Sequence, residues 1–170
     1  DNNLLSIKDT PEFIENKRLD SPTNKICTSL LSKERISFFL KYGLAYVNNT
    51  KGLEKHVMRY PQFFATQAIK KEIDRGIKRG IIWHTQGSGK TALSYFNVEF
   101  LKDFFQEKGI IVKFYFIVDR LDLLKQASLE FSARSLVVHT INDKKSFIKD
   151  FNENSSITNS SGKNEITVVN

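Results

Sequence analysis

Cysteine is almost absent from this chain, since Cys27 is the only one among 170 residues. A single cysteine excludes an intrachain disulfide and any metal site built on several cysteines, and it fits a reducing, cytoplasmic setting. Long apolar runs are also missing, because none approaches the roughly 20 residues that a membrane-spanning helix needs. The acidic, asparagine-rich beginning is unlike a secretory signal. These absences favour a soluble protein of the cytoplasm with no membrane contact.

The composition is that of a basic globular protein. At 40% hydrophobic content the chain can bury a core, and its length suggests one domain, or one domain with a small appendage. A formal net charge of +7 favours a polyanionic partner. His56, His84 and His139 are too scattered to indicate a metal site, and no G-x-S-x-G nucleophile turn is present.

One glycine-rich stretch carries the chemistry of a phosphate-binding loop. It reads Thr85-Gln86-Gly87-Ser88-Gly89-Lys90-Thr91. Backbone N–H groups must approach a phosphate chain closely, and side chains at Gly87 and Gly89 would obstruct that approach. Lys90 would place its charge against the β and γ phosphates, and the Thr91 hydroxyl suits the Mg²⁺ of the nucleotide. The stretch therefore predicts a site for ATP and Mg²⁺, with Lys90 and Thr91 in the catalytic roles.

The flanks of the loop agree with this interpretation. The apolar run from Ile81 to Trp83 predicts a buried strand, and apolar residues at helical spacing after Lys90 predict a helix that stops near Gly109. One departure is His84, where the strict pattern G-x-x-x-x-G-K-[ST] has glycine. The alternative is a Gly/Ser surface turn that happens to precede Lys-Thr.

Helices and strands are expected to alternate along the rest of the chain. Helices are predicted over residues 33–47, 62–74, 121–131 and 143–151. Strands are predicted over residues 113–119, 135–140 and from 166 onward. Residues 1–30 are expected to be irregular, with a turn at 21–24 and one short helix, and the Ser/Asn-rich run 152–164 indicates a mobile loop. The alternation predicts an α/β fold, a parallel sheet with helices on both faces.

Two motifs resemble those of a known family. The segment from Trp83 to Thr91, His84 included, resembles the phosphate loop of the R (restriction) subunits of type I restriction-modification enzymes. Downstream, the segment from Phe116 to Gln126 is similar to the next motor motif of that family, V-D-R-x-x-L-x-x-Q. The resemblance runs from about Lys33 to the end, and it implies a P-loop, RecA-like lobe of a superfamily 2 helicase-like motor.

A third segment looks like the adenine-reading motif of superfamily 2 helicases. It reads Arg59-Tyr60-Pro61-Gln62-Phe63-Phe64-Ala65. The resemblance implies that Gln62 hydrogen-bonds the adenine edge, which suits an amide, and that Arg59 or Tyr60 packs against the ring. The alternative is that Tyr60, Phe63 and Phe64 are core aromatics and Gln62 is an ordinary helix-start residue.

The resemblance also divides the chain and marks what it does not contain. It implies a mainly helical linker at 1–57 and the N-terminal part of an incomplete ATPase lobe at 58–170. The family's acidic metal motif, second motor lobe and arginine motif are expected later in the chain, and its nuclease domain earlier. We therefore expect a fragment that binds nucleotide weakly and does not turn it over.

The resemblance implies double-stranded DNA as a partner, together with the methylase and specificity subunits of a restriction complex. Arg120, Lys125 and Gln126 are the candidates for contact with the DNA backbone, which suits a motor that moves along any sequence. The alternative places Arg120 and Lys125 on a solvated helix face and Gln126 in the interior.

Two other functions remain open from the residues. One is a helicase-like ATPase of repair or remodelling, which an upstream nuclease domain would argue against. The other is a nucleotide-independent docking module, in which the helix predicted at 33–47 binds a partner subunit and the loop is vestigial. The intact sequence of Gly89, Lys90 and Thr91 argues against a vestigial loop.

Overall fold

The computed structural model describes residues 31–152 and 163–170. The turn and short helix predicted within residues 1–30, and nearly all of the predicted loop at 152–164, lie outside the described residues. The chain divides into two compact units, Asp1–Gly43 and Leu44–Asn170. The boundary predicted between residues 57 and 58 stays a prediction. Within the described ranges, no helix combines the length and apolar character needed to cross a membrane.

Helix α3 (Lys33–Tyr42) is shorter than the helix predicted over residues 33–47. The Ser32 side chain caps its start by accepting a hydrogen bond from the Arg35 backbone N–H, and Gly43 follows its last residue. The predicted length was wrong because the apolar residues that follow Gly43 belong to a strand.

An antiparallel hairpin, which the sequence analysis did not predict, follows the helix. Strand β1 (Leu44–Asn49) pairs along its whole length with β2 (Gly52–Val57). Ala45 and Val47 are buried, whereas Tyr46 between them is exposed. This alternation is the two-residue period of a strand, and the same apolar residues had been interpreted with a helical period.

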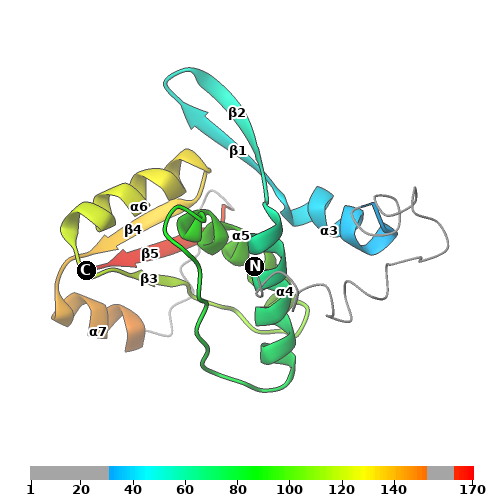
Figure 1. Cartoon of the computed structure of the whole chain (residues 1–170). Helices are drawn as coiled ribbons and strands as arrows, with labels where there is room; N and C mark the ends of the chain where they lie inside the picture. The colour runs from blue at the N-terminus through cyan, green and yellow to red at the C-terminus, as the bar shows by residue number, and fades with distance from the viewer. Residues whose placement is uncertain (1–30, 153–162) are drawn as a thin grey trace. The chain divides into compact units, whose positions relative to one another are not determined.

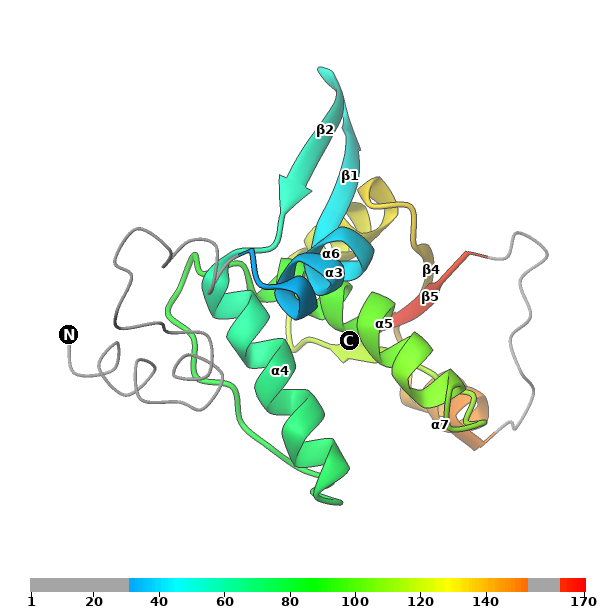
Figure 2. The ribbon, with the colours of Figure 1, turned by 90° about the vertical axis from the view of Figure 1, so that its right-hand side faces the viewer.

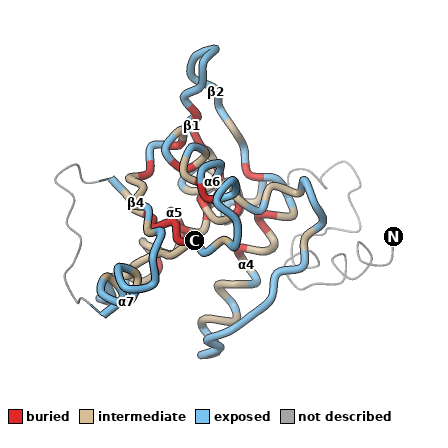
Figure 3. Tube along the Cα trace, turned by 90° about the vertical axis from the view of Figure 1, so that its left-hand side faces the viewer, coloured by how far each residue is buried: buried red, intermediate tan, exposed pale blue. Residues whose placement is uncertain are grey.

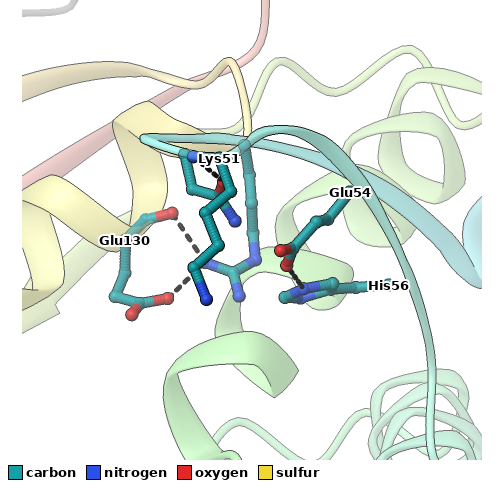
Figure 4. A network of polar contacts seen from close by, with 6 residues as sticks. Lys51, Glu54, His56 and Glu130 are labelled. Atoms are coloured by element: carbon teal, nitrogen blue, oxygen red, sulfur yellow. Dashed lines mark hydrogen bonds and ion pairs between the residues drawn. The ribbon is translucent and has the colours of Figure 1, made fainter.

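The hairpin lies against helix α6 (Leu121–Ala133). Figure 4 shows polar residues at this junction, with Glu130 from α6 and the Glu54–His56 pair from the hairpin. The buried Arg134 guanidinium at the end of α6 donates to the Glu130 backbone carbonyl (2.7 Å) and to its carboxylate. Arg134 thereby satisfies a carbonyl at the end of the helix, where a positive charge is favourable.

The centre of the second unit is a three-stranded parallel sheet (Figure 1). Its strands are β3 (Tyr115–Ile117), β4 (Val137–Ile141) and β5 (Glu165–Val169), in the order β3-β5-β4. All three strands were predicted at these places. The central strand β5 is buried from Ile166 to Val169, as expected for a parallel strand covered on both faces.

Helices cover both faces of this sheet. Successive residues of a strand point to opposite faces. In β3, the Tyr115 ring contacts Phe147 in α7 (Lys144–Asn152), whereas the neighbouring Phe116 ring contacts Phe131 in α6. The helices α6 and α7 therefore lie on opposite faces, as Figure 1 shows. The predicted fold class is confirmed, and the arrangement is consistent with an incomplete RecA-like lobe.

Helices α4 (Tyr60–Asp74) and α5 (Lys90–Gln106) complete the unit, close to their predicted positions. Four buried apolar side chains of α5 recur at three and four residues along one face of the helix, namely Leu93, Phe96, Phe100 and Phe104. Tyr95 and Val98 are buried on the opposite face. Figure 3 shows buried residues along α5, which is part of the core of this unit.

The strand predicted at residues 81–83 is absent. The segment between α4 and α5 has no strand, and Figure 3 shows it mostly exposed. Ile81 is 92% exposed and Trp83 is 91% exposed. The prediction was wrong because an apolar run becomes a strand only beside another strand that completes its backbone hydrogen bonds. The described sheet provides no neighbour for residues 81–83.

Candidate nucleotide-binding site

The glycine-rich loop leads directly into the first turn of α5. Gly87 (φ 74°) and Gly89 (φ 82°) both adopt the left-handed conformation that favours glycine. Gly89 is the N-cap residue of α5, no side chain caps this end, and the first turn contains no acidic residue. The unpaired N–H groups and the positive dipole end of α5 therefore remain available to an anion.

The start of α4 is held against this loop by the Gln62 side chain. Gln62 is only 3% exposed. Its Oε1 accepts a hydrogen bond from the Arg59 N–H (2.8 Å), and its Nε2 donates to the Gly89 carbonyl oxygen (3.1 Å). The first turn of α4 also lacks acidic residues. Two helix N-termini of positive potential thus meet at one place.

The position of Gln62 refines what the sequence suggested. Its bond to the Arg59 N–H is that of a capping-box residue at the start of a helix, and its bond to the Gly89 carbonyl connects α4 to the loop as well. Each of its amide atoms makes one of these bonds, which leaves a second N–H and a second lone pair on the group. The reading of adenine by Gln62 stays a prediction.

The aromatic residues around Gln62 fall into two groups. Tyr60 is 56% exposed and Arg59 is exposed as well, so both are accessible beside the loop. Phe63 is buried, and its ring meets Phe64 at 5.3 Å between centroids. The core interpretation therefore fits Phe63, whereas Tyr60 is free of the core.

Lys90 folds back over the loop. Its Nζ donates to the carbonyl oxygens of His84 (3.3 Å) and Thr85 (3.1 Å). Both acceptors are neutral, and among the described residues no carboxylate forms an ion pair with Lys90. The ammonium charge at the loop is therefore not compensated by an acidic side chain.

Two buried polar atoms at the loop have no hydrogen-bond partner among the residues that the structure describes. They are Ser88 Oγ and His84 Nδ1. Buried polar atoms in folded proteins almost always have a hydrogen-bond partner. Together with Lys90, the uncapped start of α5 and the half-buried Thr91, these atoms fit a polar, anionic ligand such as a nucleotide polyphosphate with its Mg²⁺. The exposed Gln86 completes the loop.

The candidate DNA-binding residues lie elsewhere, at the start of α6. Arg120, Lys125 and Gln126 are all exposed, so Gln126 does not pack in the interior. Arg120 makes two hydrogen bonds to the Asp122 carboxylate, of 3.0 and 2.8 Å. This guanidinium lowers the pKa of Asp122. Lys125 has no such acidic partner among the described residues.

The three histidines lie in separate surroundings. His56 contacts Glu54 on β2 (3.4 Å), and His139 on β4 contacts Glu165 on β5 (2.9 Å). Within the described residues, no group of three or more metal-binding side chains occurs.

Two residues behind the site were not predicted from the sequence. Thr66 in α4 and Asn97 in α5 form a hydrogen bond of 2.9 Å between Thr66 Oγ1 and Asn97 Oδ1. Thr66 is fully buried. A polar residue inside an apolar helix face is the only sequence signal of such a pair, and it does not identify the partner.

Known proteins resemble this chain over the same region. Residues 55–170 match the protein family described as "Type III restriction enzyme, res subunit". Over 100 residues the chain is 40% identical to the putative type I restriction enzyme MjaVIIP endonuclease subunit of Methanocaldococcus jannaschii. This alignment covers 55% of this chain and 9% of that protein. Over 87 residues it is 36% identical to the type I restriction enzyme SauCOLORF180P endonuclease subunit of Staphylococcus aureus (strain COL). That alignment covers 50% of this chain and 9% of the relative.

No solved structure is significantly similar to the chain. The aligned region is a small part of each curated relative, 9% of its length in both cases. The family match covers more than half of this chain. The resemblance to R subunits of type I restriction enzymes is thereby confirmed, and the chain belongs to the family of restriction-enzyme res subunits.

Proposed function

We propose that this chain is the ATP-binding portion of the DNA-translocating motor in a type I restriction endonuclease R subunit. The observation that carries the proposal is the junction of α4 and α5, where Gln62 joins the two helix N-termini and Lys90 lies uncompensated over the loop. The relatives' names and the family match support a restriction system.

In this proposal each residue of the loop has one task. The N–H groups around Gly87 and Gly89 bind phosphate oxygens, and Lys90 neutralises their charge. Ser88 Oγ finds a partner there, and Thr91 holds Mg²⁺, which supplies charge neutralisation to phosphoryl transfer. Arg59, Tyr60 and Gln62 stand where the adenine would be read, beside the same loop.

The other parts of the proposed function follow from the family. The subunit works in the cytoplasm with methylase and specificity subunits, and its substrate is double-stranded DNA. Arg120, Lys125 and Gln126 contact the DNA backbone, which their exposure at one end of α6 permits. Hydrolysis also needs groups that orient water and neutralise developing charge, and this chain assigns none, so we expect no turnover by the chain alone.

The proposal is tested by Lys90→Ala in the complete subunit that contains this chain. We expect DNA-stimulated ATP hydrolysis to fall about a hundredfold or more, because a charged group that acts on the phosphates is removed. Folding and assembly with the other subunits should be unchanged.

The matched control is Lys102→Ala. Lys102 is on the same helix, outside the loop, and pairs with Asp103 (3.2 Å). Its removal takes away the same charge and should leave hydrolysis within about twofold. Hydrolysis that survives Lys90→Ala would show that the loop is not the nucleotide site.

A further inference from the structure

Helix α4 is joined to α5 and to the residues that flank it by four side-chain contacts that follow the same order along both segments. Toward the start, Gln62 contacts Gly89, and Thr66 contacts Asn97. Further on, the Lys70 ammonium lies 5.6 Å from the centre of the Phe104 ring, and Lys108 pairs with Asp74 (3.0 Å). The two helices therefore run in the same direction from a common end, as Figure 2 shows.

A parallel arrangement of this kind has an electrostatic consequence. Both helices bring the positive ends of their dipoles to the loop, and neither first turn carries an acidic residue to balance them. Repulsion between these ends would move α4 away from α5 unless other contacts held the pair. The Gln62–Gly89 bond alone cannot fix how far along α5 the other helix sits.

The contacts differ in their ability to fix that position. Asp74 and Lys108 are exposed and long or mobile enough to keep their pairing through a small slide, so they constrain the helices weakly. Thr66 is 0% exposed and donates through a short, branched side chain to Asn97 Oδ1 at 2.9 Å. A slide of either helix would leave the hydroxyl of the buried Thr66 without this acceptor, which is costly.

We propose that Thr66 and Asn97 are positioning residues for the nucleotide: their hydrogen bond sets α4 along α5 so that Gln62 reaches Gly89 and both helix N-termini face one polyphosphate. The proposal rests on the proposed function. Thr66 lies one helical turn after Gln62, on the same face of α4. A shift of α4 that moves Thr66 therefore moves the Gln62 side chain as well.

The first test needs no nucleotide. In nuclear magnetic resonance spectra of the chain, the side-chain NH₂ signals of Gln62 report its bond to Gly89. Thr66→Val removes the hydroxyl and keeps the shape, and it should move these signals toward those of a free amide. Thr66→Ser keeps the hydroxyl and should restore them. Unchanged Gln62 signals in Thr66→Val would overturn the proposal.

The second test measures binding of ATP with Mg²⁺ by calorimetry in a double-mutant cycle. Thr66→Val should weaken binding about five- to tenfold, the effect of one lost hydrogen bond. In the Gln62→Ala background the same change should have almost no further effect, because Thr66 acts through Gln62. Equal losses in both backgrounds would contradict a positioning role.

Two control variants separate positioning from general destabilisation. Asp74→Asn cuts the exposed pair at the far end of the helices and should leave the Gln62 signals in place. Phe131 is a buried core residue of α6, and it does not belong to the Thr66–Asn97 hydrogen bond. Phe131→Leu should lower stability without moving the Gln62 signals. If Phe131→Leu moved them as Thr66→Val does, stability alone would explain the effect and the proposal would fail.

The two claims can fail separately. If the unmodified chain and the complete subunit bound no ATP, the proposed function would be wrong, and the Gln62 signals would still decide whether Thr66 positions the amide. If ATP bound but Thr66→Val left both affinity and signals unchanged, only the positioning claim would be wrong.

Discussion

Two steric reasons require glycine at position 89, just before α5. Its φ of 82° lies in the left-handed region, and a Cβ at this position would come within 2.5 Å of Gln62 Nε2. Gly87 shares the left-handed conformation (φ 74°), but a Cβ there would meet nothing within 4 Å. A side chain at Gly87 would therefore cause backbone strain alone, whereas a side chain at Gly89 would cause backbone strain and a clash with Gln62.

Alanine at each of these positions should show the difference. We expect Gly87→Ala to lower the free energy of unfolding by about 1 kcal/mol, the cost of a left-handed alanine. Gly89→Ala should cost about 2 to 3 kcal/mol, because it also displaces a buried amide from its hydrogen bonds. Urea unfolding of the two variants measures the costs. Equal costs would show that Gln62 does not depend on Gly89.

The residues of the loop could be predicted because their chemistry is local. Gly87, Gly89 and Lys90 follow one another in the sequence, and phosphate binding explains their order. The bridge from Gln62 to the Gly89 carbonyl could not be predicted, because it depends on how two separate helices pack. The Thr66–Asn97 bond escaped prediction for the same reason.

At the scale of elements, Tyr115 in β3 makes several contacts with α7. The Tyr115 hydroxyl donates to Asp150 (2.5 Å), and its ring contacts the rings of Phe147 and Phe151 at 5.5 and 5.8 Å between centroids. Burial, followed by the hydrogen bond to Asp150, raises the pKa of Tyr115 to about 12 from 10.0. The neutral hydroxyl is thus the form that stabilises this contact.

The raised pKa predicts a loss of stability in alkali. A folded pKa above the unfolded value means that the stabilisation is complete below about pH 10 and is lost as the pH rises through about 12. Tyr115→Phe should cost about 1 kcal/mol at neutral pH by removing the hydrogen bond. It should also make the unfolding free energy fall less steeply between about pH 10 and about pH 12.

Urea midpoints of wild type and Tyr115→Phe across this range provide the measurement. Some alkaline dependence should remain in the variant, because burial, followed by Glu99, also raises the pKa of Tyr95 to about 12. Identical pH dependence in both proteins would show that Tyr115 is not held in its neutral form by α7.

Helices were predicted more accurately than strands. The period of apolar residues in α4, α5 and α6 is local information, and it located all three. Strand pairing is not local. Residues 81–83 carry a strand pattern without a neighbouring strand, and Leu44–Asn49 became a strand because it pairs with β2.

At the scale of the whole molecule, a net charge of +7 favours contact with DNA. Of the candidate residues, Arg120 already shares its charge with Asp122, whereas Lys125 has no acidic partner among the described residues. A phosphate would have to compete with Asp122 for Arg120. Lys125 should therefore contribute more to binding.

This expectation is tested with a duplex of arbitrary sequence at several salt concentrations. Lys125→Ala should weaken binding and lower the slope of log affinity against log salt by about 1, as for one lost phosphate contact. Arg120→Ala should have a smaller effect. Lys102→Ala is the charge-matched control, and an equal effect of all three variants would mean that only net charge matters.

The central claim is that a nucleotide polyphosphate binds where α4 and α5 begin, and a titration of the chain with ATP and Mg²⁺, followed through its backbone amide resonances, tests it most directly. The account predicts that the largest shifts fall on residues 86–92 and that Lys90→Ala abolishes them. Shifts centred on another part of the chain, or shifts at residues 86–92 that persist in Lys90→Ala, would contradict it.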